Sequence, residues 1–193
     1  MEKLKESDLY SLEQYARIRE EFRNKVIIHK KNRRLALGEH AALYFEDRLT
    51  MQYQVQEMLR LERIFEPELI REELDVYNPL IPDGMNWKAT FMLEYADEGE
   101  RRSALSRLVG IERNIWIRVE GFDKVRPHAN EDMERATDDK TASVHFLRFE
   151  LDPEMIESIG KGNRVHAGID HPAYHSECDI PEEVMTSLKN DFV

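Results

Sequence analysis

Apolar residues recur at helical spacing in three segments of the first part of the chain. The first segment predicts a helix over residues 11–32, and the second predicts a helix over residues 49–65. The third begins at Pro67, a residue that suits the first turn of a helix. We therefore expect this part of the chain to be mainly helical.

Two short apolar runs lie between the first two predicted helices. Residues 33–38 and 41–46 flank a turn that contains Gly38, which is typical of a β-hairpin. Residues 78–84 are rich in residues that interrupt helices and strands, and they predict a boundary. We expect a helical N-terminal region with a β-hairpin over residues 1–82.

The rest of the chain alternates between strand and helix patterns. Strands are expected over residues 88–95, 114–120, 143–151 and 164–170, with helices over 98–109 and 153–160. The resulting β-α-β-β-α-β order is that of a ferredoxin-like sheet with both helices on one face. We expect this α+β unit over residues 83–175 and a C-terminal helix within residues 176–193, all in one compact globule.

The strand patterns also divide the predicted sheet into two faces. Ile115 and Ile117 point to the helix-covered face, and Trp116 points to the other, where Phe146 joins it. Exposed aromatic side chains are costly in water. The N-terminal helices, a second copy of the chain or a ligand should therefore cover that face. A polar loop is expected over residues 121–142.

The net charge of −11 is unevenly distributed. Residues 1–64 carry 13 Lys and Arg against 11 Asp and Glu, whereas residues 65–193 carry 15 against 28. An acidic surface repels nucleic acid phosphates and anionic membranes. An anionic partner is thus expected to meet only the first third, and nucleic acid is not an expected partner of the rest.

Cysteine usage and hydropathy indicate a cytoplasmic location. Cys178 is the only cysteine, so no disulfide can form within the chain, as expected in a reducing compartment. The first residues lack the apolar stretch of a signal peptide, and the longest apolar run, residues 41–45, is far shorter than a membrane span.

A histidine cluster near the end of the chain is one candidate site. The candidate metal ligands are His166, His171, His175 and Cys178. Imidazole and thiolate ligands suit zinc or iron. The spacing matches no established metal motif, so a turn at His171 with surface or hydrogen-bonded neighbours is the favoured interpretation.

The second predicted helix carries a polar stripe. Gln52, Gln56 and Arg60 lie one turn apart, and Tyr53 and Glu57 form an adjoining row. The stripe is either a solvated face with ion pairs or a ligand pocket against the hairpin. The candidate ligand-binding residues are His40, Glu46, Arg48, Tyr53, Gln56, Glu57 and Arg60.

The first predicted helix and the start of the hairpin carry a run of basic residues. The run is Arg17, Arg19, Arg23, Lys25, Lys30, Lys31, Arg33 and Arg34. It could contact nucleic acid phosphates, but such runs are common on solvated helices, and we favour that interpretation. Phosphate-cradling, dinucleotide-binding and nucleophile-elbow motifs are absent, so the sequence identifies no reaction.

The chain resembles a bacterial family catalogued as domain of unknown function 3501. The segments that carry the resemblance are RRLALGEH at 33–40, YFEDR at 44–48, YQVQEMLRLE at 53–62, YN at 77–78 and GIDHPAY at 168–174. Genes of this family often lie beside those of rubrerythrin-like di-iron proteins and iron–sulfur oxidoreductases. The resemblance implies a role in peroxide defence or electron-transfer metabolism, with such a protein as partner. It adds Asp170 and His171 as positions to test.

These observations favour a non-catalytic accessory or ligand-binding protein linked to redox or peroxide-stress metabolism. A metal-dependent protein that uses iron or zinc at the histidine cluster is the first alternative. A nucleic-acid-binding protein that uses the basic first helix is the second. The sequence leaves the cofactor unknown, and it allows a homo-oligomer.

Overall fold

The computed structural model describes residues 1–131 and 139–192, which form a mixed α+β fold. The N-terminal elements follow the predicted pattern closely. They are the short 3-10 helix η1 (Glu6–Asp8), α1 (Leu12–Lys31), β1 (Arg34–Ala36), β2 (Ala41–Glu46), α2 (Arg48–Glu62), α3 (Pro67–Tyr77) and η2 (Asn78–Leu80). The three predicted helices and the hairpin are thus confirmed.

Local side-chain chemistry fixes the ends of these helices. The Ser11 hydroxyl accepts a hydrogen bond from the backbone N–H of Gln14 at 3.2 Å and so caps the start of α1. Asp47 caps α2 in the same way through the N–H of Thr50 at 2.9 Å. Arg63 ends α2 in the left-handed conformation, with φ at 57°.

The remaining elements begin after residue 85. They are β3 (Asn86–Leu93), α4 (Glu98–Arg107), η3 (Ile111–Arg113), β4 (Ile115–Val119), β5 (His128–Ala129), β6 (Val144–Glu150), α5 (Pro153–Gly160), β7 (Val165–His171), β8 (Tyr174–Asp179), α6 (Glu182–Leu188) and η4 (Lys189–Asp191). The short strand β5 lies inside the predicted loop over residues 121–142, of which 132–138 fall outside the described residues. Strand β8 is an addition to the prediction.

The pairing of the strands does not confirm the ferredoxin-like order. In the described part of the chain, one sheet has the order β1-β2-β3-β6-β5 and a second has the order β4-β7-β8. The four predicted strands are thus divided between two sheets, and every pairing is antiparallel. The physical reason is that the hairpin takes one edge of β3, with Leu43 opposite Phe91, while β6 takes the other.

The main core lies between the two sheets. The inner residues of both sheets belong to one hydrophobic cluster, which α4, α5 and α6 extend. Ile115 and Ile117, the residues predicted to face the core, are buried there, together with Val119, Leu147, Phe149, Val165, Ala167 and Ile169. Burial of this much apolar surface is the main driving force for the fold.

Trp116 is also buried, and the chain itself covers it. The amine of Lys124 lies 3.9 Å from the centre of the indole ring, and the guanidinium of Arg118 lies 5.5 Å from it. Gly168 lies against the ring, because a Cβ atom there would come within 2.4 Å of the indole. The surface expected to cover Trp116 is thus supplied by Arg118, by Lys124 in the loop after β4, and by the neighbouring strand β7.

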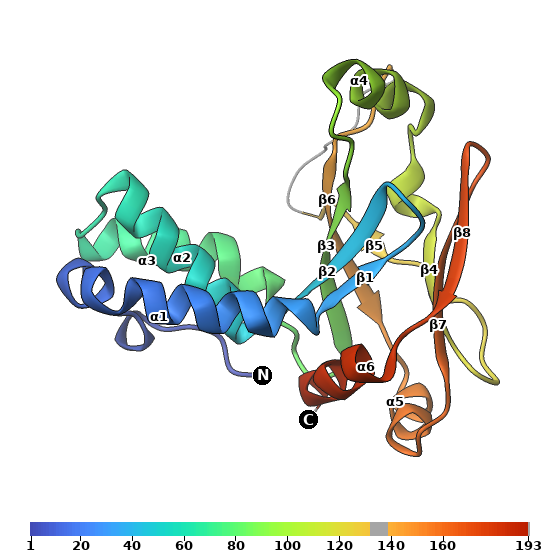
Figure 1. The fold of residues 1–193 in the computed structure, drawn as a ribbon. Coiled ribbons are helices and arrows are strands. Elements are labelled where there is room, and N and C mark those ends of the chain that lie inside the picture. The colour runs from blue at the N-terminus through green and yellow to red at the C-terminus, as the bar shows by residue number, and fades with distance from the viewer. Residues whose placement is uncertain (132–138, 193) are drawn as a thin grey trace.

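The helices α1, α2 and α3 form a layer that extends to one side of the sheets (Figure 1). Two smaller apolar clusters hold this layer together. One contains Leu4, Val55 and Leu74, and the other contains Tyr15 and Phe22. In the described residues, no helix is long and apolar enough to cross a membrane.

Candidate functional site

The polar stripe of α2 fastens the N-terminal segment to the helix. The Gln56 side chain accepts a hydrogen bond from the Tyr10 N–H at 2.5 Å and donates one to the Tyr10 carbonyl at 3.3 Å. One turn earlier, Gln52 donates to the Asp8 carbonyl at 2.7 Å. Arg48 forms an ion pair with the Asp8 carboxylate at 2.7 Å. This side of α2 is therefore a clamp for a segment that lies beside it.

The adjoining row of α2 holds α1 in place through Glu57. Arg19 donates two hydrogen bonds to this carboxylate, each 2.8 Å long. Tyr15 donates to it at 2.7 Å, and Arg60 at 3.2 Å. The bonds from Arg19, together with those from Tyr15 and Arg60, outweigh burial and lower the pKa of Glu57 to about 2. Burial and the neighbouring carboxylate raise the pKa of Tyr15.

The other candidate residues do not contact Glu57 through hydrogen bonds in the described residues. Tyr53 packs against α1, with its ring centre 6.2 Å from that of Phe22. The Glu46 carboxylate is buried and accepts a hydrogen bond from Thr90 at 2.7 Å. His40 lies at the opposite end of β2 from α2, where its ring stacks on Tyr95 with ring centres 4.2 Å apart. The structure therefore does not place His40 near the α2 stripe.

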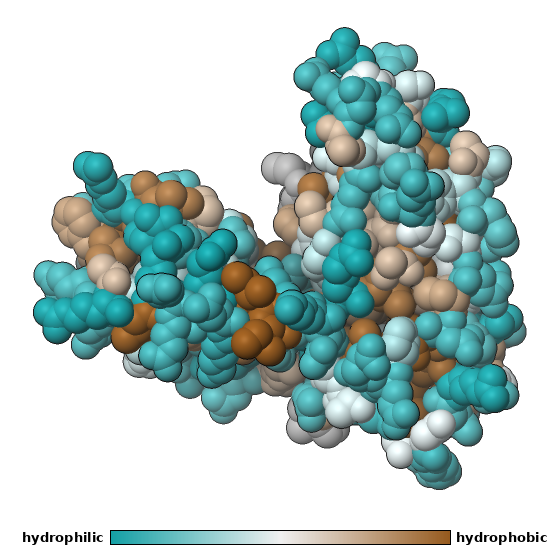
Figure 2. All heavy atoms as spheres, viewed as in Figure 1, coloured by the Kyte–Doolittle hydropathy of each residue, from teal (hydrophilic) through white to brown (hydrophobic). Residues whose placement is uncertain are grey.

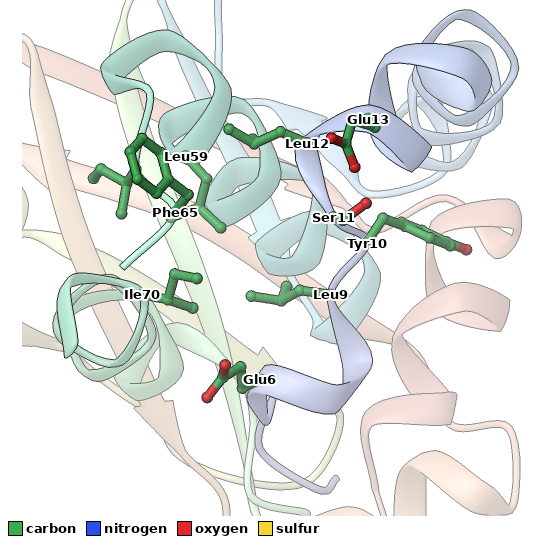
Figure 3. Close-up of a pocket in the computed structure, with 10 residues that line it drawn as sticks. Glu6, Leu9, Tyr10, Ser11, Leu12, Glu13, Leu59, Phe65 and Ile70 are labelled. Atoms are coloured by element: carbon green, nitrogen blue, oxygen red, sulfur yellow. The ribbon is translucent and has the colours of Figure 1, made fainter. Parts of the chain in front are cut away.

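A groove of about 440 Å³ opens between residues 6–13, α2 and α3. We call it the N-terminal groove. Leu9 and Ile70 point toward each other across it, and Leu12 points toward Leu59 and Phe65 (Figure 3). Its lining residues are Glu6, Leu9, Tyr10, Ser11, Leu12, Glu13, Leu59, Ile64, Phe65 and Ile70. The groove is therefore apolar in its interior, and its polar lining residues all come from residues 6–13.

The surface around the N-terminal groove combines exposed apolar side chains with carboxylates. Phe65 is 69% exposed, Leu61 is 62% exposed, and Leu69 is 41% exposed. Figure 2 shows apolar atoms distributed among polar atoms on this helical layer. Burial, together with the charges of Glu62 and Glu72, raises the pKa of Glu73 on α3. The carboxylates thus form a locally crowded negative surface.

Comparison with protein families shows which family the chain belongs to. The family described as "Protein of unknown function (DUF3501)" matches residues 3–192. The chain belongs to the DUF3501 family. A comparison with curated proteins gave no match.

The fold of this DUF3501 protein is similar to that of a crystal structure described as a novel protein of unknown function from Burkholderia pseudomallei K96243. The two chains are 44% identical, the TM-score is 0.94, and the similarity covers 100% of each chain. The two proteins therefore share their fold over the whole of the DUF3501 chain.

The histidine cluster of this DUF3501 chain is spread over the β7–β8 hairpin. His166 pairs with Asp179 across the strands, and His175 stands opposite Asp170 on the same face. Cys178 stands opposite Ala167, so it points to the other face. The fourth residue, His171, also points there and bonds the Val109 carbonyl at 3.1 Å.

The four candidate metal ligands therefore divide between two faces of a sheet. Asp170, the position that the family resemblance adds, pairs with Lys124 at 2.9 Å. In the part of the chain that the structure describes, no three His, Cys, Asp or Glu side chains lie close enough together to hold a metal ion. Cys178 is half-buried, and burial, with two neighbouring acids, raises the pKa of its thiol.

Part of the basic run is committed to internal contacts in this DUF3501 protein. Arg19 bonds Glu57, and Arg34 pairs with Glu94 at 2.8 Å. Arg33 is 1% exposed and pairs with Asp191 at 2.6 Å. These three arginines therefore serve the fold and are not free to bind phosphates.

Sequence reasoning missed the contacts that hold the first residues of the chain against residues 78–81. The side chain of Asn78 bonds both the N–H and the carbonyl of Leu4, at 2.8 and 3.0 Å. Lys3 donates to the carbonyls of Asn78 and Ile81. Residues 78–84 were expected to be a boundary, yet they are a second clamp on the start of the chain. The isolated Asn-Pro pair was the only signal, and it predicts a turn rather than a clamp.

Proposed function

We propose that this DUF3501 protein is a non-catalytic accessory protein that docks an apolar segment of a partner protein in the N-terminal groove. The observation that carries the proposal is the clamp between Gln56 and Tyr10. Two side-chain hydrogen bonds hold an irregular segment beside α2, and this keeps Leu9 facing Ile70 of α3 and Leu12 facing Leu59 and Phe65. A preformed apolar groove reduces the entropy lost on binding.

The surroundings of the groove favour a protein segment over a small molecule. Phe65, which lines the groove, is largely exposed, so the apolar lining continues to the surface. Contiguous exposed apolar surface with a polar rim is typical of protein interaction sites. The carboxylates that line the groove, Glu6 and Glu13, complement a partner that carries Lys or Arg beside its apolar anchors.

The chemistry of the polar residues supports a non-catalytic role. A general acid or base works best when its pKa lies near the operating pH. Glu57 has its pKa lowered to about 2, and four hydrogen bonds tie it to neighbouring side chains. This carboxylate is therefore suited to hold α1 rather than to transfer a proton.

A redox protein is the partner that the family context suggests. Genes of the family often lie beside those of rubrerythrin-like di-iron proteins and iron–sulfur oxidoreductases. Such a partner would link this protein to peroxide defence or electron-transfer metabolism in the cytoplasm. A second copy of the chain is the competing occupant of the groove.

Calorimetric titration with a purified rubrerythrin-like protein and with an iron–sulfur oxidoreductase from the same organism tests the proposal. We expect one of them to bind the wild-type chain, and Leu9→Glu and Ile70→Glu to weaken that binding at least tenfold. Ile28→Glu, on an exposed part of α1, is the control and should bind normally. Binding that survives both groove variants would refute the groove as the docking site.

The same titration separates the remaining outcomes. Absence of binding to both redox proteins would refute the proposed partners. The molar mass of the free protein, measured by light scattering, then tests whether a second copy fills the groove. A dimer that Ile70→Glu dissociates would replace the redox partner with self-association.

A further inference from the structure

The outer face of the larger sheet carries a row of charged side chains. Across the strands, Glu46 stands opposite Lys88, Lys88 opposite Arg148, and Arg148 opposite His128. Directly opposed residues project from the same face of a sheet. Two cations, Lys88 and Arg148, therefore stand side by side, which destabilises a sheet unless a negative charge accompanies them.

Arg148 has its negative partners within the chain. Its guanidinium donates to both carboxylate oxygens of Glu131, at 2.8 and 2.6 Å. It also contacts the carboxylate of Glu150. This two-pronged geometry is the strong form of an arginine–carboxylate pair. The charge of Arg148 is therefore neutralised.

Lys88 has no such partner in the described residues. Its side chain is almost fully buried, with 8% of the residue exposed. Its amine donates to the carbonyl of Pro79 at 2.5 Å, the one hydrogen bond that it makes to the described residues. An ammonium group has three donors, so two remain. A buried charge without a counterion is costly, and burial lowers the pKa of Lys88, with Lys3 adding to the effect.

A cavity of about 340 Å³ lies beside this amine. Its lining residues are Pro79, Leu80, Lys88, Glu131, Phe146, Leu147 and Arg148. The volume falls within the range of about 300–1,000 Å³ that is usual for small-molecule sites. An apolar wall with a few converging polar groups is the usual composition of such a site.

We propose that this cavity binds a small carboxylic acid with an apolar body. The carboxylate lies on the Lys88 amine, and the body packs against Leu80 and Phe146. The charge balance selects a carboxylate, because no carboxylate of the described residues contacts the Lys88 amine, and the charges of Asp83 and Glu150 offset its burial only in part. A phosphate dianion would place a second negative charge beside Glu131 and Glu150. This site is separate from the N-terminal groove and does not depend on the proposed docking function.

Calorimetric titration with phenylacetate, benzoate and isovalerate tests the proposal on the full chain. We expect at least one of these acids to bind. Its neutral amide, which keeps the shape and loses the charge, should bind at least about tenfold more weakly, or about 1.4 kcal/mol. Inorganic phosphate should bind more weakly than the acid. Equal affinity for acid and amide, or tighter binding of phosphate, would overturn the assignment, and so would failure of all three acids to bind.

Variants then locate the site. Lys88→Met keeps the apolar stem and removes the charge, and we expect it to lose at least tenfold in affinity. Phe146→Ser should weaken binding through the apolar wall, whereas Lys189→Met, at an exposed lysine, should bind like the wild type. Amide chemical shifts of the wild-type protein give a reading that needs no variant. Shift changes remote from Lys88 and Phe146 would place the ligand elsewhere and refute the site.

Discussion

The Nη2 atom of Arg33 lies 2.6 Å from the Oδ2 atom of Asp191, and the pair joins residues 158 positions apart in the protein interior. Arg33 also donates to the carbonyls of Phe45 and Glu46. Burial raises the pKa of Asp191 to about 6, although the charge of Arg33 opposes this shift. The pair therefore fastens the end of α1 and the hairpin to the C-terminal segment.

Asp191→Ala is expected to lower the free energy of unfolding by about 3 kcal/mol, because it leaves the Arg33 charge buried without its carboxylate. This value is near the lower end for a broken buried pair, since Arg33 keeps its backbone acceptors. Urea unfolding measures the change. Lys189→Ala, at an exposed neighbour, should leave the unfolding midpoint unchanged. A loss no larger than that of this control would contradict the assigned role.

The pH dependence of stability reports on the same carboxyl group. A carboxyl whose pKa is raised on folding stabilises the native state below its unfolded pKa, which is about 4. That contribution is lost as the pH rises through about 6. We expect Asp191→Asn to remove this part of the pH dependence in urea unfolding curves. An identical pH profile in the variant would count against a raised pKa.

Glu57 should contribute a pH dependence of opposite sign. Its pKa is lowered to about 2, so its stabilising effect is present above the ordinary carboxyl value and is lost as the pH falls toward 2. Glu57→Gln should therefore be less stable than the wild type at neutral pH, with a smaller difference in acid. Thermal unfolding monitored by circular dichroism measures this convergence. A difference that stays constant with pH would show that Glu57 does not act as a carboxylate.

Gln56→Ala should release the segment around Tyr10 from α2. Removing the side chain leaves the Tyr10 N–H and carbonyl without their acceptor and donor, so the segment should open more often. Hydrogen exchange at the Leu9 and Tyr10 amides should accelerate at least tenfold. Gln54→Ala, on the same helix, is the matched control and should exchange normally. Unchanged exchange in Gln56→Ala would exclude the clamp.

Gly168→Ala tests the packing around Trp116. The added methyl group would lie 2.4 Å from the indole and 2.6 Å from the Ser176 carbonyl oxygen, so the strand or the ring must move. Overpacking of this kind costs about 1–3 kcal/mol. Gly160→Ala, at the end of α5 where no atom lies within 4 Å, should cause no loss and can stabilise the protein by up to about 1 kcal/mol, because alanine favours the helix. Intrinsic tryptophan fluorescence should shift only in the first variant.

Local patterns in the sequence were sufficient to predict most individual elements. The alternation of Ile115, Trp116 and Ile117 identifies a strand because side-chain direction has a period of two. Pro67 marks a helix start because its fixed backbone angle suits the first helical turn. Such signals depend on neighbours in the sequence and need no knowledge of the tertiary fold.

Strand partners and the wall of the groove depend on distant residues, and the sequence did not reveal them. The alternation along β4 does not specify its partner: the ferredoxin-like order would place it beside β6, whereas it pairs with β7 in the second sheet. The α2 stripe identified Gln56, but its partner is the backbone of Tyr10, which any residue would provide. The position of Lys88 beside Arg148 likewise depends on the strand register.

The pairing of β2 with β3 has a consequence for dissecting the chain. The two strands pair along the whole of β2, from Ala41 opposite Leu93 to Glu46 opposite Lys88, and β3 lies beyond residue 82. A fragment that stops there would present the N–H and C=O groups of β2 to solvent, on a strand that is largely apolar. Exposed edges of this kind recruit other chains. Expressed alone, the helical half would thus aggregate, whereas adding a synthetic β3 peptide should restore its solubility.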